Sequence, residues 1–395
     1  MRKSMLVILC LSALAPSIAY ALVIPPWARK YNMNCSGCHA PVVPRLNATG
    51  LHFKWAGYRM PNEIGDTMVV KRLEEYVGTR GILRYSYAKT QGEPSETNSL
   101  GVPAVSVFAA GALGTNYGAY FELEREPEGT VDVIAQALRI WGKENGFGGV
   151  RAGVGHILVG GAVAGFDRPV GILPPLPLSE RTTAAIPFSF AGDQAAIEAF
   201  YVAGGRNRSS VQLLNGVTAG EEGGPPSTKK DVAFTNQFIW DDDGSGITTI
   251  AYFGQVAGLD ATLPITSRYY RIGASANKIM GPFEALAGYV YGSDSRLPVT
   301  ETSSFTSSKA TGSGYWFSGQ YAVPKSNWTF YGRYEYLDPQ RSEADDALRR
   351  MVIGSVLPVN VPEYLRFAFE YFRDMPQLSG SPKRNGFGAE IMIAF

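Results

Sequence analysis

The chain ends on the stretch GFGAEIMIAF, residues 386–395, in which apolar or aromatic side chains alternate with small or charged ones. Alternation with a period of two residues predicts a β-strand whose two faces meet different surroundings. The stretch closes on Phe395, and a terminal aromatic residue behind an alternating strand is typical of bacterial outer-membrane β-barrels. The C-terminus therefore favours a barrel that crosses a membrane with strands.

The same alternation recurs upstream, for example in FYGRYEYL at 330–337 and in YLRFAFEYF at 364–372. About sixteen segments of roughly ten residues carry it, an even number as in single-chain bacterial barrels. They lie near 73–87, 102–112, 116–126, 130–142, 147–157, 194–205, 208–219, 230–241, 246–256, 266–278, 282–292, 311–323, 326–338, 347–357, 361–373 and 386–395. We therefore predict an all-β fold, an outer-membrane barrel of about sixteen strands. A soluble β-protein is the alternative.

The amino-acid composition is that expected of such a barrel. The chain of 395 residues holds 45 Gly, 21 Tyr and 20 Phe, and its formal net charge is only +1. Mean hydropathy is −0.05, as expected when lipid-facing and lumen-facing residues alternate and average out. Near-neutral charge argues against nucleic acid as a partner. The predicted surroundings of the barrel are outer-membrane lipid.

The N-terminal residues 1–21 have the features of a signal peptide. Arg2 and Lys3 supply positive charge, residues 5–15 form an apolar run, and the sequence AYA at 19–21 is a small-x-small cleavage site. The apolar run is too short to span a bilayer as a helix, which argues against a retained membrane anchor. We expect export of the chain and a mature start near Leu22.

The mature chain would keep two cysteines, both in the stretch Cys35-Ser36-Gly37-Cys38-His39. Cys-x-x-Cys-His is the attachment pattern of c-type haem. Two thiols at this spacing reach the vinyl groups on one edge of the porphyrin, and the next residue offers its imidazole to the iron. We predict one covalent haem c on Cys35 and Cys38, with His39 as the proximal ligand. A bare disulfide and a zinc site are the alternatives, although zinc needs four ligands.

The residues around this motif resemble the haem segment of the fused cytochrome–porins, outer-membrane proteins best known from iron-oxidising bacteria. The resemblance is carried, beside the haem motif, by Ala28, Arg29, Pro44, Leu46, Gly50, Phe53, Gly57 and Tyr58. It covers a small part of the chain. The architecture that it implies, one haem joined to a barrel of about sixteen strands, agrees with the strand count. The resemblance further implies that electrons come from an extracellular donor such as ferrous iron.

We divide the chain into a signal peptide at 1–21, a c-type cytochrome segment at 22–65 and a porin-like barrel at 66–395. Only about fifty residues lie between Leu22 and the first predicted strand, and so short a segment cannot cover a porphyrin by itself, because small chains bury little surface. The barrel lumen must supply the remaining walls, and a barrel of this size is wide enough to do so. We therefore expect the haem segment to act as a plug or cap.

The sixth iron ligand has two candidates. His52 lies on the same segment as His39 and could loop back, although the family pattern has no fixed His at that place. Met60 is slightly favoured, and Met ligation would raise the reduction potential. Met33 is too close to Cys35 to reach the far face. His156 lies in a strand pattern and is expected to be an ordinary barrel residue.

The longest break in the strand pattern is 158–192, which contains LPPLPL at 173–178. It follows an odd-numbered strand, so we expect it on the extracellular side or folded inward. Three prolines in four residues preclude a regular helix or ladder there.

Three functions are compatible with these features. The first is an electron conduit, in which the haem passes electrons between an extracellular reductant and a periplasmic cytochrome or other carrier; as an enzyme it would be an oxidoreductase. The second is a diffusion porin whose haem segment gates or senses. The third is a soluble periplasmic cytochrome with a β-partner domain.

Overall fold

The computed structural model describes most of the chain. The described residues are 26–39, 45–67, 72–125, 130–154, 170–186, 188–190, 192, 194–216, 229–257, 266–296, 298–299, 304–305, 309–343, 345–360, 364–377 and 381–394. The predicted signal peptide, His156 and Phe395 lie outside them. Within the described part of the chain, no helix is long and apolar enough to cross a membrane.

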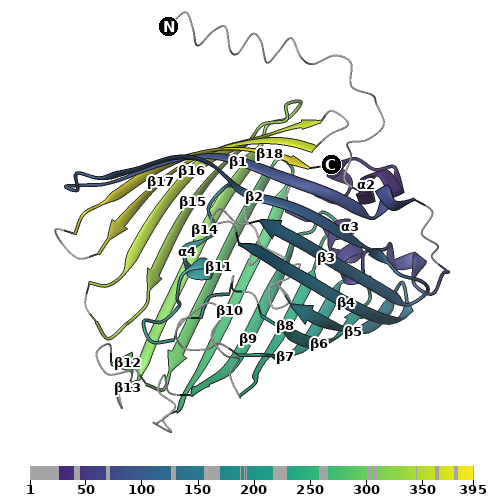
Figure 1. Ribbon diagram of the computed structural model, residues 1–395, viewed down its shortest axis with the longest axis horizontal. Coiled ribbons are helices and arrows are strands. Elements are labelled where there is room, and N and C mark those ends of the chain that lie inside the picture. The colour runs from purple at the N-terminus through teal and green to yellow at the C-terminus, as the bar shows by residue number, and fades with distance from the viewer. Residues whose placement is uncertain are drawn as a thin grey trace, which may run out of the picture.

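Sixteen antiparallel strands form one closed barrel (Figure 1). Each strand pairs with its neighbours in chain order, and β1 closes the ring by pairing with β18. The bounds are β1 (Val77–Thr90), β2 (Glu96–Ala112), β3 (Tyr117–Arg125), β4 (Val131–Lys143), β5 (Gly146–Val154), β6 (Ala196–Ala203), β7 (Asn207–Leu214), β8 (Asp231–Ile239), β9 (Gly246–Ala257), β10 (Thr266–Met280), β11 (Phe283–Asp294), β14 (Ala310–Ala322), β15 (Thr329–Asp338), β16 (Leu348–Asn360), β17 (Tyr364–Pro376) and β18 (Arg384–Ala394). A separate two-stranded sheet joins β12 (Pro298–Val299) to β13 (Ser304–Phe305). The predicted all-β barrel is confirmed, and every predicted strand segment overlaps one strand of the ring.

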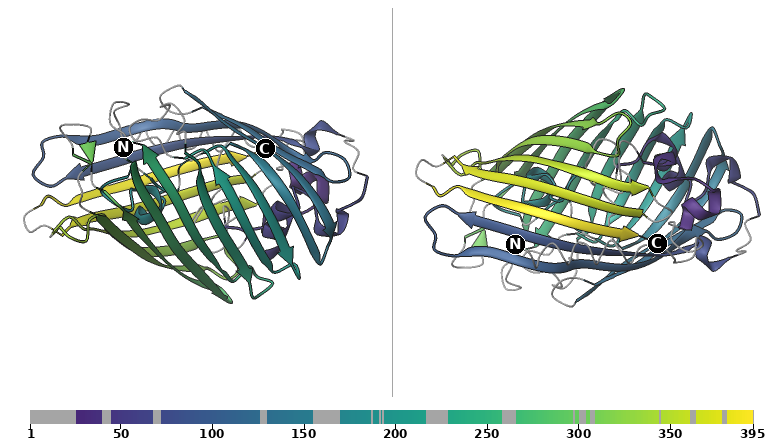
Figure 2. Two further views of the ribbon diagram at one scale, coloured as in Figure 1. Left: turned by 90° about the horizontal axis from the view of Figure 1, so that it is seen from below. Right: turned by 90° about the horizontal axis from the view of Figure 1, so that it is seen from above.

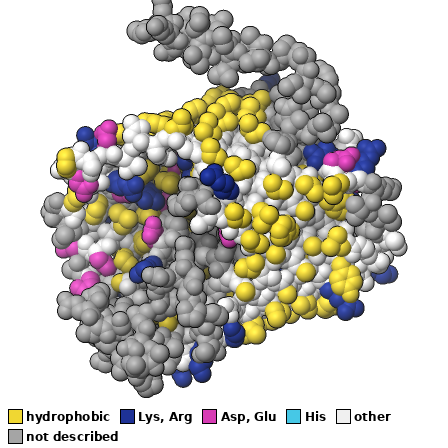
Figure 3. Space-filling view, viewed as in Figure 1, with side chains coloured by type: hydrophobic (Ala, Val, Ile, Leu, Met, Phe, Trp, Pro, Cys, Tyr) yellow, Lys and Arg dark blue, Asp and Glu magenta, His cyan; other side chains and the backbone are white. Residues whose placement is uncertain are grey.

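The wall has an apolar outside and a polar inside. Along β6, buried and exposed residues alternate at every position. Ile197 and Tyr201 face outward and are 55% and 56% exposed, whereas Glu198 faces the lumen and is fully buried. On the face seen in Figure 3, hydrophobic side chains spread over the right-hand wall, and most charged side chains lie toward the two ends. This is the surface that a barrel presents to lipid.

The two ends of the barrel differ in the length of their connections. At one end the turns are short, with 144–145 joining β4 to β5 and 204–206 joining β6 to β7. At the other end the connections are longer, above all the one at 155–195 between β5 and β6. Outer-membrane barrels have short periplasmic turns and long extracellular loops. The end with the short turns therefore faces the periplasm.

The predicted haem segment lies inside the periplasmic end of this barrel, between its walls (Figure 2). We call the described residues of 26–67 the plug. Its elements are α2 (Pro26–Tyr31), the 3₁₀ turn η1 (Cys35–Gly37), α3 (Ala48–Trp55) and the 3₁₀ turn η2 (Pro61–Glu63). A further 3₁₀ turn, η3 (Leu73–Glu75), leads into β1, so the wall begins some residues after the predicted boundary at 65.

Close backbone contacts seat the plug against the wall. The Arg59 side chain is fully buried and donates to the carbonyls of Gly114 and Thr115 in the β2–β3 turn, at 3.2 and 2.6 Å. Gly57 lies directly against Gly118 of β3, and a Cβ added to Gly118 would come within 2.5 Å of the Gly57 carbonyl oxygen. The two backbones can approach so closely only because both residues are glycines.

The described residues of the connection between β5 and β6 fold into the lumen, the second of the two placements expected for it. We call these residues, 170–186, 188–190 and 192, the inner loop. The Glu370 carboxylate of β17 accepts hydrogen bonds from the backbone N–H groups of Ile172 and Leu173, at 3.0 and 3.1 Å. Glu335 of β15 accepts one from Leu176 at 2.7 Å. Wall carboxylates thus satisfy backbone donors that the loop buries.

One sequence expectation about this loop was too strong. The proline-rich stretch does form a single helical turn, α4 (Leu176–Ser179), which lies inside the barrel in Figure 1. Pro177 stands within its first two positions, where its missing N–H is not needed for the helix.

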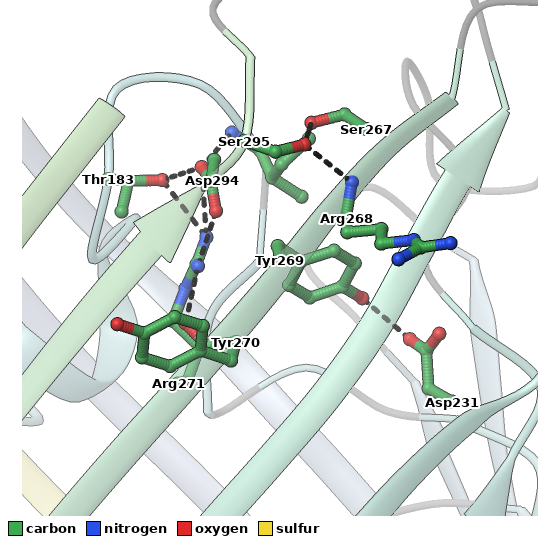
Figure 4. A network of polar contacts seen from close by, with 10 residues as sticks. Thr183, Asp231, Ser267, Arg268, Tyr269, Tyr270, Arg271, Asp294 and Ser295 are labelled. Carbon is green, nitrogen blue, oxygen red and sulfur yellow. Dashed lines mark hydrogen bonds and ion pairs between the residues drawn. The ribbon is translucent and has the colours of Figure 1, made fainter. Parts of the chain in front are cut away.

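A buried ion pair fixes the next part of the inner loop (Figure 4). Arg271 of β10 and Asp294 of β11 are both fully buried and paired at 2.5 Å. Asp294 also accepts hydrogen bonds from the Thr183 hydroxyl and from the Ile186 N–H. Removing one partner of such a pair would leave an uncompensated buried charge, at a cost of about 3–5 kcal/mol.

An apolar core fills the lumen beside β6–β14. It joins side chains from the plug, the inner loop and the wall, among them Leu51, Trp55, Phe188, Phe190, Ile250, Leu286, Val290 and Trp316. Phe188 packs on Tyr252 with ring centroids 4.4 Å apart. The hydroxyls of Tyr252 and Tyr269 both donate to Asp231, at 2.5 and 2.6 Å. Part of the interior is therefore packed like the core of a soluble protein.

The contact between Gly57 and Gly118 generates a test of how the plug is seated. Gly118→Ala should unseat it, because the new methyl group would meet backbone and cost on the order of 1–3 kcal/mol. Limited proteolysis of the folded protein in detergent should then cut the plug faster than in wild type, while the barrel keeps its heat-modifiable migration on gels.

Gly319→Ala is the matched control, since that strand glycine has open space around its Cβ position. Equal cleavage of the plug in both variants and in wild type would contradict the proposed seating.

Candidate haem-binding site

The Cys-x-x-Cys-His motif lies on one tight turn of the plug. The N–H groups of Cys38 and His39 both donate to the carbonyl of Cys35, at 3.2 and 2.9 Å. One short turn therefore carries both thiols and the imidazole. Both cysteines are free thiols in the structure, and burial raises the pKa of each.

Helix α3 braces the motif through its first residues. The Asn47 side-chain amide donates to the carbonyls of Ser36 and Gly37, at 3.2 and 3.1 Å. Its oxygen caps the helix by accepting from the Gly50 N–H at 3.0 Å. A Cβ on Gly50 would lie 2.3 Å from the Cys38 carbonyl oxygen, so this position requires glycine.

His39 is oriented by a backbone carbonyl. Its Nδ1 lies 3.0 Å from the carbonyl oxygen of Arg45, which can only accept, so Nδ1 carries the proton. The lone pair is then on Nε2, the arrangement found in most metal-ligating histidines. Arg45 in turn forms a buried ion pair with Glu284 of β11, which ties this loop of the plug to the wall.

The motif opens onto a cavity of about 830 Å³ in the lumen. This volume lies within the range of about 300–1,000 Å³ that is usual for cofactor sites. The plug contributes Trp27, Met33, Cys35, Cys38, His39, Phe53, Tyr58 and Met60, and the inner loop contributes Gly171, Ile172, Leu173 and Pro174. The wall contributes Arg80, Arg84, Glu122, Glu124, Arg151, Arg366 and Glu390, among others. The cavity thus lies between the plug and the inner loop.

Met60 lines the same cavity as the motif. Its backbone N–H donates to the Glu63 carboxylate at 2.9 Å, and the Tyr31 hydroxyl donates to the same oxygen at 2.6 Å. Burial, followed by the hydrogen bond to Glu63, raises the pKa of Tyr31 and keeps its hydroxyl protonated. Tyr31 therefore positions the Glu63 carboxylate, which in turn holds the backbone of Met60.

His52 points elsewhere. It is not among the described residues that line the cavity. Its ring lies 5.6 Å from that of Trp55, and the backbone of Gly205, in the periplasmic turn between β6 and β7, is among the groups that act on its pKa. Burial, the largest effect, lowers the pKa of His52 below its ordinary value of 6.5. The placement favours Met60 over His52 as a residue able to face the motif.

Trp27, Phe53 and Tyr58 of the plug line the cavity. Trp27 stacks on Tyr58 at 5.7 Å, and Tyr58 stacks on Tyr120 of β3 at 5.5 Å. Phe53 packs against both plug rings. Trp55 instead faces the apolar core, where its Nε1 donates to Gln237 at 3.1 Å.

Sequence reasoning missed the charged wall of the cavity. Arg84, Arg366 and Glu390 come from three strands that are far apart in the sequence and adjacent in the closed ring. The sequence does carry a sign of this charged wall, because charged residues stand at the inward-facing positions of strands whose side chains alternate.

The described residues contain no group of three His, Cys, Asp or Glu side chains that could hold a metal ion.

Comparison with known proteins identifies the fold. No protein-family model matches the sequence, and no curated protein is recognisably related to it. An anion-selective porin from Comamonas acidovorans is similar in structure, with a TM-score of 0.56 and 14% identity over 81% of this chain and 99% of its own. The outer-membrane channel DcaP of Acinetobacter baumannii gives 0.54 and 12%, over 81% and 97%. OmpT, an outer membrane protein of Vibrio cholerae, gives 0.54 and 14%, over 81% and 97%.

At this identity the likeness shows the fold alone. The chain has the closed sixteen-stranded barrel of outer-membrane porins. Together with the apolar outer wall, this supports the predicted outer-membrane location and contact with lipid.

The lowered pKa of His52 generates a pH-dependent prediction. When the plug is displaced from the wall, His52 takes up a proton below about pH 6.5, whereas in the seated plug it does so only at a lower pH. The seated plug should therefore become less stable, relative to the displaced plug, as the pH falls through this range. Protease cleavage of the plug in the folded barrel should therefore speed up from about pH 7.5 to about pH 5.5.

His52→Gln, which cannot take up the proton, should show a flatter pH dependence of this cleavage rate. Gel migration at each pH checks that the barrel itself stays folded. The same pH dependence in the variant and in wild type would contradict the assignment to His52.

Proposed function

We propose that the protein is an outer-membrane c-type cytochrome whose barrel encloses one haem and passes electrons between an extracellular donor and a periplasmic carrier. The observation that carries the proposal is the placement of Cys35, Cys38 and His39 together on one turn facing a lumen cavity of about 830 Å³. A disulfide or a surface site would not need such a volume beside it.

The residues around the cavity fit a haem. Cys35 and Cys38 would hold it through thioether links, and His39 would offer Nε2 to the iron, since Nδ1 is bonded to the Arg45 carbonyl. We assign the sixth position to Met60, which lines the same cavity and is held by Glu63. Bound there, a haem supplies a one-electron carrier with a potential raised by Met ligation.

The architecture supports a role in crossing the membrane. The hydrocarbon core of a bilayer is about 30 Å thick, and a single haem does not span it. Because the plug lies at the periplasmic end, a soluble periplasmic carrier can approach the site from that side. The inner loop lies between the cavity and the extracellular end. The resemblance of the haem segment to the fused cytochrome–porins favours ferrous iron as the donor.

A diffusion porin with a haem-bearing gating or sensing segment is the second candidate. The likeness to an anion-selective porin and to an outer-membrane channel favours it. The apolar core that packs plug and inner loop against β6–β14 argues against a wide water-filled path. Conductance of the purified protein in a planar bilayer separates the two, since a diffusion porin would show steady open-channel current and a filled barrel would not.

The electron-transfer proposal predicts that ferrous iron reduces the purified, oxidised protein in detergent. Met60→Ala should lower the reduction potential and remove the weak near-infrared sulfur–iron absorption band, because the sulfur ligand is lost. His52→Ala is the matched control and should leave both unchanged. Absorption spectroscopy during a redox titration measures each outcome.

Absence of the sulfur–iron band in the wild type, with a reduction potential that changes in His52→Ala and not in Met60→Ala, would give the ligand position to His52. Failure of ferrous iron to reduce a haem that another small reductant does reduce would contradict iron as the donor.

A further inference from the structure

A group of three charged residues lies on the cavity wall formed by β1, β17 and β18. Arg84 donates to the Glu390 carboxylate through Nε and a terminal nitrogen, at 2.9 and 2.6 Å. Arg366 donates to the other oxygen of Glu390 at 3.3 Å and to the Gly171 carbonyl of the inner loop at 2.9 Å. All three residues line the cavity onto which the haem motif opens.

This group carries an excess positive charge in a largely buried place. Two guanidinium groups share one carboxylate; the side chains of Arg366 and Glu390 are 5% and 3% exposed, and that of Arg84 is 29% exposed. The Nε of Arg366 is buried and has no hydrogen-bond partner. The neighbouring Arg80 shows the opposite balance, because two carboxylates, Glu122 and Glu124, converge on it. Excess positive charge without a counter-charge is costly to bury.

We propose that Arg84 and Arg366 bind the two propionate carboxylates of the haem, an inference that rests on the proposed function. A haem tied to Cys35 and Cys38 by its vinyl edge carries its propionates on the opposite edge. Two carboxylates entering a buried cavity need cationic partners, and the planar guanidinium group is the donor best matched to them. The group Arg84–Glu390–Arg366 supplies that charge on a wall that the plug does not form.

Arg151 of β5 also lines the cavity and belongs to a second group in which two guanidinium groups share one carboxylate. Arg151 is held by the buried Glu198 and lies within reach of Gln136 at 3.4 Å. Its neighbour Arg208 shares Glu198. Arg151 is therefore the rival position for a propionate, and the experiment includes it.

The experiment measures haem content, midpoint potential and resonance Raman spectrum of the purified holoprotein in detergent. Replacing Arg84, Arg366 and Glu390 together with Gln removes one net positive charge without stranding a buried carboxylate. Because positive charge near the haem favours the reduced form, this triple variant should lower the reduction equilibrium constant about tenfold, or ~59 mV for one electron. It should also shift the propionate-bending band.

Glu390→Gln alone adds one net positive charge and should move the potential in the opposite direction. A general disturbance of the fold would not give effects of opposite sign. The matched control is Arg350→Gln with Asp374→Asn, a lumen ion pair on β16 and β17 that does not belong to the described cavity lining. It should leave the potential and the band unchanged.

If the triple variant fails to assemble, the double variant Arg84→Lys with Arg366→Lys is tested in its place. This double variant keeps the charge, so its reduction equilibrium constant should stay within twofold of the wild-type value. The propionate-bending band should still shift, because the guanidinium fork is lost.

Unchanged potential and band in all these variants, in a protein that carries haem, would overturn the inference alone. A shift that appears only in Arg151→Gln would overturn it in favour of Arg151. A wild-type protein without haem would overturn the proposed function and this inference with it.

Discussion

Closure of the barrel is the constraint on which the rest of the structure depends. In lipid, every backbone N–H and C=O must find a partner within the protein, so a sheet that spans a membrane cannot keep an open edge. Pairing of β1 with β18 removes that edge. Once the ring is closed, each strand has one face toward lipid and one toward the lumen. Charged residues then face the lumen rather than lipid, where they can bind segments of the chain that enter the barrel.

Two segments use these inward charges from opposite ends. The inner loop is fastened where Glu335, Glu370 and Asp294 accept its backbone N–H groups. The plug is fastened by the Arg45–Glu284 ion pair and by glycine contacts that bring backbones together. Between them, an apolar core fills one side of the lumen and a cavity remains on the other. Packing rather than flexibility therefore positions the Cys-x-x-Cys-His turn.

The sequence allowed the strands and their number to be predicted because period-two alternation is strong where one face meets lipid and the other a polar lumen. A plug inside the barrel could also be anticipated, from the shortness of the segment between Leu22 and the first strand. The charged group of Arg84, Arg366 and Glu390 could not, since it forms only when β1, β18 and β17 meet in the ring. The same holds for Met60 and His52, because only tertiary packing turns one toward the cavity and the other toward a periplasmic turn.

The proposed function depends on one haem bound covalently at Cys35 and Cys38 inside the barrel. Intact mass spectrometry of the mature protein, purified from outer membranes, measures whether that haem is present. We expect the mass of the processed chain plus one haem, and the loss of that added mass, together with haem staining, when Cys35→Ser and Cys38→Ser are combined. A wild-type chain that is processed, inserted in the outer membrane and folded, yet carries no haem, would contradict it.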